Sequence, residues 1–192
     1  GPEGSELHSP RALFATATEQ DLIYQLDCLC RQSGLHGAKD LPGGAKLFLN
    51  VRPTTIHDPA FRAESISKTL EACGLRPCDM VFEISEQESI GNFDIFREVR
   101  DYYRRLGFQI ALDDTGAGYA SLEAVMELSP DFIKVDRAFV HGIDQDPGRQ
   151  ELLRALCSVA DRLGARIIGE GLDTLEELST LAGLGIPFGQ GG

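Results

Sequence analysis

The chain has 192 residues, of which 42% are hydrophobic and 25% are charged, and this ordinary balance predicts one globular domain or most of a larger one. The net charge of -12 and the isoelectric point near 4.7 argue against binding to duplex DNA or RNA through the phosphates, because that mode needs basic surfaces. Acidity alone does not separate an enzyme from a protein that is simply well solvated.

Apolar residues recur at three- and four-residue spacing from residue 10 to residue 33, and this pattern predicts a helix. Residues 34–44 are rich in glycine and indicate a loop. Short apolar runs then alternate with helical patterns. Strands are predicted at 46–51, 80–85, 108–113, 132–136 and 166–170, and a sixth begins within 187–190. Helices are predicted at 58–72, 90–106, 121–128, 150–163 and 174–182.

The predicted strands are apolar without alternation and helices follow them, which indicates a parallel sheet covered by helices. A doubly wound sheet and a (β/α) barrel both fit this order. The barrel is favoured because a polar residue stands at the C-terminal end of nearly every strand, and a barrel brings all its strand ends to one mouth. These strand-end residues are Asn50, Glu83, Asp113, Lys134, Glu170 and Gln190.

Several of these side chains suit cation binding or proton transfer. Asp113 and Asp114 are adjacent carboxylates before a glycine-rich turn, and such pairs favour a cation beside them. Lys134 lies inside an apolar strand, so its ammonium group must reach a polar cavity or pair with carboxylates. Asp136 shares the strand face of Lys134 and could orient it. The glycines on both sides of Glu170 leave room for a bulky ligand.

Each of these residues also has a simpler explanation. A carboxylate after a strand often caps the next helix, and turns are rich in aspartate and glycine. Lys134 could instead be exposed on an edge strand. Six polar strand ends in order are harder to explain as caps, so the set as a whole indicates a site for divalent cations.

The ordered motifs resemble those of the EAL domain family. They are Phe-Leu-Asn50-Val-x-Pro, Phe-Glu83-Ile-Ser-Glu86, Asp113-Asp114-Thr-Gly-Ala-Gly, Ile-Lys134-Val-Asp136, Gly-Glu170-Gly-Leu-Asp-Thr174 and Gly-Gln190-Gly. Their order and spacing match the family over residues 10–192. The resemblance implies an α/β fold of the modified TIM-barrel, or (β/α)8, type, in which the first strand runs against the others. It also implies a domain that often forms homodimers.

The resemblance further implies a role for each matching residue. Lys134 and Glu170 would orient and deprotonate the attacking water, with Glu170 near a second metal. Gln190 would contact the substrate, and Glu86 would support the loop at 113–118, which in this family also contributes to the dimer interface. The ligands of Mg²⁺ or Mn²⁺, all offering oxygens suited to hard cations, would be Asn50, Glu83, Asp113 and Asp114.

These roles imply metal-dependent hydrolysis of the bacterial second messenger cyclic di-GMP to linear pGpG. A two-metal site would polarise the phosphodiester and lower the pKa of a bound water. The cations would also reverse the sign of an acidic mouth that otherwise repels a dianionic substrate. The alternative is an inactive EAL domain that serves as a cyclic di-GMP receptor or as an interaction module.

The sequence departs from the family pattern in several places. The signature Glu-Ala-Leu is absent, and we expect residues 1–192 to form a single EAL domain without its first two strands and its last element. Either a longer parent protein supplies these parts, and sensory or GGDEF domains can accompany it there, or the domain is truncated and inactive. We favour the first reading. Thr115 replaces the usual phenylalanine, and Leu172-Asp173 replaces the common Val-Glu.

The cysteines and the hydropathy pattern bear on the cellular compartment. Five cysteines, an odd number, stand at spacings that do not match a zinc site, so we expect reduced thiols in a cytoplasmic protein. No stretch approaches about 18 consecutive apolar residues, and the first residues do not resemble a signal peptide. A membrane anchor elsewhere in a parent protein stays compatible with this expectation.

Overall fold

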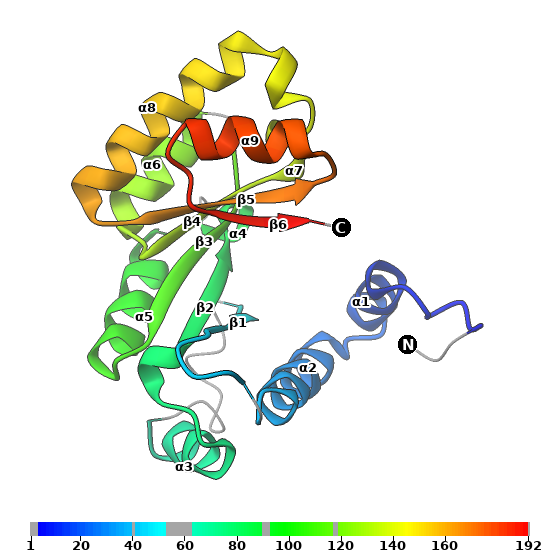
Figure 1. Cartoon of the computed structure of the whole chain (residues 1–192). Helices are drawn as coiled ribbons and strands as arrows, with labels where there is room; N and C mark the ends of the chain where they lie inside the picture. The colour runs from blue at the N-terminus through cyan, green and yellow to red at the C-terminus, as the bar shows by residue number, and fades with distance from the viewer. Residues whose placement is uncertain (1–3, 40, 53–62, 90–92, 117–118, 192) are drawn as a thin grey trace.

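Six parallel strands form one curled sheet, in which the strands lie side by side in chain order from β1 to β6 (Figure 1). The computed structural model describes residues 4–39, 41–52, 63–89, 93–116 and 119–191. The strands are β1 Leu47–Asn50, β2 Met80–Ser85, β3 Gln109–Thr115, β4 Phe132–Val135, β5 Arg166–Leu172 and β6 Phe188–Gly191. The sheet curls into half of a barrel, which confirms the predicted α/β fold of an incomplete TIM barrel.

Helices connect the strands, and in Figure 1 α5, α8 and α9 lie outside the curve of the sheet while α2 lies beside β1. The α-helices are α1 Pro10–Glu19, α2 Ile23–Gly37, α3 Ala63–Cys73, α4 Glu86–Ser89, α5 Phe93–Arg105, α6 Tyr119–Leu128, α7 Arg137–Val140, α8 Pro147–Leu163 and α9 Leu175–Gly183. Two short 3₁₀ helices, η3 Pro77–Asp79 and η4 Ile143–Gln145, complete the described elements. Among the described helices, none combines the length and the apolar character that a membrane crossing requires.

The main hydrophobic core lies between the outer face of the sheet and the covering helices. Phe82 of β2 is fully buried there, with its ring centroid 4.6 Å from that of Tyr103 and 4.9 Å from that of Phe108. Aromatic contacts of this kind add to the gain from burying apolar surface. A second, smaller cluster occupies the inner face and contains Val81, Ala111, Phe132 and Ile168.

The single helix predicted over residues 10–33 is wrong, because two helices occupy this region. Asp21 has a φ of 57°, a left-handed conformation that stops α1 before α2 begins. The predicted loop at 34–44 also begins too early, since α2 continues to Gly37. A Cβ atom at Gly34 would lie 2.6 Å from Leu49 Cδ2, so this glycine serves the close approach of α2 to β1 instead of a turn.

The remaining predicted elements are present, β2 with its predicted bounds and the others with shifted ends. Predicted helices 58–72 and 90–106 correspond to α3 and α5, and their predicted starts lie outside the described residues. The one-turn helices α4 and α7 were not predicted, because four residues are too few for a periodic pattern. The prediction of Lys134 on an exposed edge strand, weighed as an alternative, is wrong: β4 lies between β3 and β5, and Lys134 is buried.

Candidate metal and phosphodiester site

The inner face of the sheet carries two layers of side chains, one apolar and one polar. Successive side chains along a strand point to opposite faces, so residues two apart share a face. The apolar residues are Phe48, Val81, Ala111, Phe132 and Ile168, which pack together. The residues two positions further along the same strands are Asn50, Glu83, Asp113, Lys134 and Glu170. The predicted strand-end residues of these five strands therefore share the concave side of the half-barrel.

Lys134 stands at the centre of the polar layer. Its Nζ lies 2.6 Å from Glu170 Oε1, 2.7 Å from Glu83 Oε1 and 2.9 Å from Asp113 Oδ1. The exposed fractions of these side chains run from 7% for Lys134 to 17% for Glu170. One ammonium group thus ties the ends of β2, β3 and β5 to β4 in surroundings largely closed to water.

Asp114 joins this group through an irregularity in β3. The pairing register between β3 and β4 shifts between Leu112 and Thr115, and Asp114 has a φ of 58°. Such a bulge redirects a side chain that would otherwise point to the opposite face. Carboxylate oxygens of Asp113, Asp114 and Glu170 consequently lie within 4.8 Å of one another. We call Glu83, Asp113, Asp114, Lys134 and Glu170 the strand-end cluster.

The strand-end cluster holds more negative than positive charge. Burial raises the pKa of Glu83, of Asp114 and of Glu170, and neighbouring carboxylates add to each rise. Burial also opposes the charged form of Lys134, yet hydrogen bonds to Glu170 and Glu83 raise the pKa of its ammonium group overall. Four carboxylates and one ammonium group leave an excess of negative charge that a cation would neutralise.

A hard divalent cation fits the donors that this cluster offers. Mg²⁺, Mn²⁺ and Ca²⁺ prefer oxygen ligands at about 2.0–2.6 Å, so oxygens that share an ion lie within about 5 Å of one another. The oxygens of Asp113, Asp114 and Glu170 meet this spacing. Burial raises the pKa of Asp114 and of Glu170, and a bound cation would oppose this rise by favouring the charged form of both groups.

The other predicted site residues lie around the cluster. Asn50 is exposed and pairs in register with Glu83, and Gln190 of β6 is exposed and pairs in register with Glu170. Glu86 is buried as the first residue of α4, which packs against β3. Its support of the loop at 113–118 stays a prediction, because residues 117–118 lie outside the described part of the chain.

Asp136 has a different contact from the one predicted. Its carboxylate caps α7 by accepting a hydrogen bond of 2.8 Å from the backbone N–H of Ala138. The ion pairs of Lys134 within the described residues go to Glu83, Asp113 and Glu170. These contacts are with Lys134 Nζ itself, and an orienting role of Asp136 stays a prediction.

A hollow of about 400 Å³ opens on the concave side, next to the cluster. Its lining alternates between the apolar and the polar layer, with Phe132 and Ile168 beside Glu83, Lys134 and Gln190. The hollow combines this apolar floor with the carboxylate of Glu83 and three basic side chains, Lys46, Lys134 and Arg166, which suits a ligand that carries both flat rings and phosphates.

Comparison with known proteins follows the same motifs. The family model for the EAL domain matches residues 1–192. The chain belongs to the EAL domain family. This EAL domain is 30% identical over 195 residues to the probable cyclic di-GMP phosphodiesterase PdeG of Escherichia coli, a match that covers 99% of the chain and 38% of the relative. It is 27% identical over 184 residues to the E. coli blue light- and temperature-regulated antirepressor BluF, covering 95% of the chain and 46% of the relative.

Solved EAL structures agree with the fold. Klebsiella pneumoniae BlrP1 has been solved as a manganese/cyclic di-GMP complex, and this EAL domain matches it with a TM-score of 0.84 and 33% identity over 95% of the chain and 47% of BlrP1. A calcium/cyclic di-GMP complex of BlrP1 gives a TM-score of 0.84 and 34% identity over 95% of the chain and 46% of BlrP1. The chain thus spans less than half of PdeG, BluF and BlrP1.

Sequence reasoning missed two residues that fix the exits of β4 and β5. Arg137 forms an ion pair of 2.5 Å with Asp173, and the buried Glu177 accepts hydrogen bonds from three backbone N–H groups. The sequence carried a signal for the second, since Thr174-x-x-Glu177 is a capping box. It carried none for the contact between Glu177 and Gly142, which are 35 residues apart.

Proposed function

We propose that this EAL domain hydrolyses cyclic di-GMP to linear pGpG with the help of Mg²⁺ or Mn²⁺. The observation that carries the proposal is the contact of Lys134 Nζ with the carboxylates of Glu83, Asp113 and Glu170. A buried acidic cluster of this kind offers both ligands for cations and a base beside them. The likeness to PdeG, a probable cyclic di-GMP phosphodiesterase, and to BlrP1 in its manganese/cyclic di-GMP complex supports the choice of substrate and metal.

The cations would be held by the oxygens of Asn50, Glu83, Asp113 and Asp114, with Glu170 beside a second ion. When bound, divalent cations supply Lewis acidity toward the phosphodiester and neutralise the charge that develops in the transition state. Gln190, which is exposed opposite Glu170 and lines the hollow, would contact the substrate. A homodimer and further sensory or GGDEF domains in the parent protein belong to the same proposal.

Glu170 acts as the general base in this proposal. Burial raises the pKa of its carboxyl group, which makes the carboxylate a stronger proton acceptor near neutral pH. It takes one proton from the attacking water, and the water oxygen forms a new bond to phosphorus. The bond from phosphorus to the 3′ oxygen breaks, and that oxygen takes up one proton from solvent while Glu170 releases to solvent the proton that it accepted, so the carboxylate is restored. Lys134, 2.6 Å from Glu170, holds the carboxylate in place.

The test is turnover of cyclic di-GMP by the complete domain with Mg²⁺ or Mn²⁺, with pGpG detected by chromatography. Glu170→Ala removes the base and is expected to lower kcat by about 10²–10⁴-fold. Glu151→Ala is the matched control, because Glu151 is 76% exposed on α8 and lies outside the cluster. Full turnover by Glu170→Ala would refute the assigned role of this residue.

A second candidate function is a cyclic di-GMP receptor or interaction module without turnover. The similarity to BluF supports this second candidate, because BluF is named as an antirepressor and not as a phosphodiesterase. The same assay separates the two functions when it is combined with calorimetry. Binding of cyclic di-GMP without pGpG formation supports the receptor, and neither binding nor turnover supports the interaction module.

A further inference from the structure

Glu177, in the first turn of α9, is buried to a degree that its local role does not explain. Its side chain is 2% exposed. Together with Thr174 it forms a capping box, in which Glu177 Oε2 accepts from the backbone N–H of Thr174 at 3.2 Å and Thr174 Oγ1 accepts from the backbone N–H of Glu177 at 3.2 Å. A capping box satisfies the start of its own helix and needs only one carboxylate oxygen.

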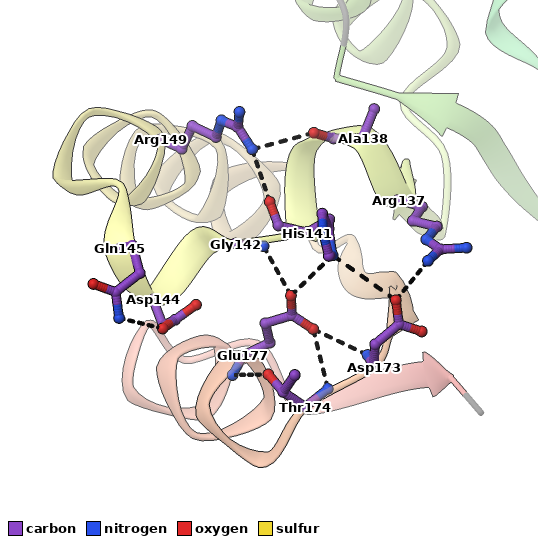
Figure 2. Close-up of polar contacts among 10 residues, drawn as sticks. All are labelled: Arg137, Ala138, His141, Gly142, Asp144, Gln145, Arg149, Asp173, Thr174 and Glu177. Carbon is purple, nitrogen blue, oxygen red and sulfur yellow. Dashed lines mark hydrogen bonds and ion pairs between the residues drawn. The ribbon is translucent and has the colours of Figure 1, made fainter.

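The second oxygen of Glu177 reaches a different segment. Glu177 Oε1 accepts a hydrogen bond of 2.8 Å from the backbone N–H of Gly142, in the loop that follows β4 and α7 (Figure 2). His141 Nδ1 lies 3.3 Å from the same oxygen. The bond to Gly142, followed by the bond from the backbone N–H of Asp173, lowers the pKa of Glu177 to about 2, so this group is ionised at every ordinary assay pH.

The segments that Glu177 joins are the exits of the two strands that carry Lys134 and Glu170. On the β5 side, Glu177 Oε2 accepts from the backbone N–H of Asp173 at 3.0 Å, three residues after Glu170. On the β4 side, Gly142 follows Lys134 by eight residues. The carboxylate of Glu177 thus spans the two strand exits with three backbone hydrogen bonds.

A second tie between the same exits supports this reading. Arg137 Nη2 lies 2.5 Å from Asp173 Oδ2, and Figure 2 shows this pair next to Glu177. The Arg137 side chain also packs on Gly171, where a Cβ atom would overlap it. Arg137 and Asp173 are 63% and 40% exposed, so solvent weakens their ion pair, whereas Glu177 is enclosed. Glu177 is therefore the stronger of the two ties.

We propose that Glu177 is a positioning residue, whose carboxylate fixes the exit of β5 against the loop after α7 and thereby holds Glu170 within reach of Lys134. The effect of Glu177 on kcat rests on the proposed function, whereas its effect on the contact between Glu170 and Lys134 does not. Residues that support a reacting group without touching it lower activity by about 10–100-fold when they are removed.

The kinetic test compares Glu177→Ala, Glu177→Gln and the control Glu176→Ala in the cyclic di-GMP assay. Glu176 is exposed in the same turn of α9. Glu176→Ala therefore removes one negative charge from this turn, as Glu177→Ala does, but leaves the three hydrogen bonds of Glu177 in place. Glu177→Ala is expected to lower kcat by about 10–100-fold with KM changed by less than about threefold, because no substrate contact is lost. Glu177→Gln keeps one acceptor oxygen but sets an amide N–H₂ against a backbone donor, so its kcat should fall in between.

The structural test does not depend on turnover. The chain has four lysines, so ¹⁵N-lysine labelling gives a simple spectrum in which the Lys134 ammonium signal is assigned by Lys134→Arg. Glu177→Ala should shift this signal and speed its proton exchange, while Glu176→Ala should leave both unchanged. If Glu177→Ala does not fold, Glu177→Gln is compared in the same way. A wild-type kcat and an unshifted Lys134 signal in a folded Glu177 variant would overturn the inference.

The outcomes for the two proposals are distinct. Absence of pGpG from wild-type protein overturns the proposed hydrolysis, and the Lys134 signal then decides the role of Glu177 alone. Turnover by wild-type protein with an unaffected Glu177→Ala variant overturns the positioning role and leaves the proposed hydrolysis standing.

Discussion

Replacement of Lys134 by methionine removes the positive charge of the strand-end cluster and keeps much of the side-chain volume. Lys134 Nζ has three carboxylate oxygens within 2.9 Å, and its side chain is 7% exposed. Removal of one partner from a buried ion pair costs about 3–5 kcal/mol, because the remaining charge is left without compensation. For a chain of this length each kcal/mol lowers Tm by about 2–4 °C, so the metal-free variant should melt about 6–20 °C lower at pH 8.

The loss should depend on pH with a definite sign. Burial already holds the pKa of Glu83 and of Glu170 above the ordinary value of 4.5, and loss of the ammonium group would raise both further. An acid whose pKa is higher in the folded state destabilises the fold above that pKa, and the penalty disappears as pH falls toward the unfolded value. The contribution of Lys134 itself is constant from pH 5 to 8, well below its ordinary pKa of 10.5. The Tm deficit should therefore shrink from pH 8 to pH 5.

The measurement is thermal unfolding of metal-free protein, followed by circular dichroism at pH 5, 6.5 and 8. Lys46→Met is the control, because Lys46 Nζ makes an exposed hydrogen bond of 2.9 Å to the carbonyl of Cys78 and lies outside the cluster. A Lys134→Met protein that melts within about 2 °C of wild type at pH 8, or whose deficit is the same at pH 5, would refute the electrostatic reasoning.

Three further predictions concern the metal, the exit of β5 and the outer core. Mn²⁺ should raise Tm at pH 8 and lose this effect toward pH 5, because protons compete with the metal for the carboxyl groups of Asp114 and Glu170, whose pKa values are raised. Thermal scans with Mn²⁺ and with EDTA test this, and a rise in Tm that does not depend on pH would contradict it. Gly171→Ala should cost at least about 1–2 kcal/mol in urea unfolding, since Gly171 has a φ of 66° and packs on Arg137, whereas Gly183→Ala, in open space, should cost nothing. Phe82→Ala should cost about 3–5 kcal/mol and the control Leu175→Ala, 77% exposed, less than about 0.5 kcal/mol; equal losses would show that Phe82 does not anchor the core.

Strand positions were the part of the fold that the sequence predicted best. The strands β1 to β5 are short, largely apolar runs with a polar residue at or near the C-terminal end, and β2, for example, has the predicted bounds Met80–Ser85. Burial on both faces of a parallel sheet demands such runs, so the signal is local and strong. The polar strand ends predicted the strand-end cluster for the same reason, since parallel strands bring their C-terminal ends to one rim.

Features set by contacts between distant segments could not be predicted in this way. The sequence predicted that Asp113 and Asp114 serve one cation, but adjacent strand residues normally face opposite sides, so strand periodicity did not predict the left-handed conformation of Asp114. The break at Asp21 between α1 and α2 is also backbone geometry within a continuous helical pattern. The bond from Gly142 to Glu177 joins residues 35 apart, and only the folded sheet brings these two loops together.

The position of the strand-end cluster is fixed by the two hydrophobic clusters, on the outer and the inner face of the sheet, more than by its own charges. A slip of one residue in β2, β3 or β5 would send a carboxylate into the outer core and an apolar side chain into the cluster. For β2, Glu83 would then take the position of Phe82 beside Tyr103 and Phe108, and burial of an unpaired charge there is far more costly than the repulsion inside the cluster. The hydrophobic core therefore stabilises a fold in which the strand-end cluster carries an excess of negative charge. This charge lowers the stability of the fold and is available to bind a cation. Lys134→Met should for this reason lower stability without altering strand register, since the hydrophobic contacts that fix the register are untouched.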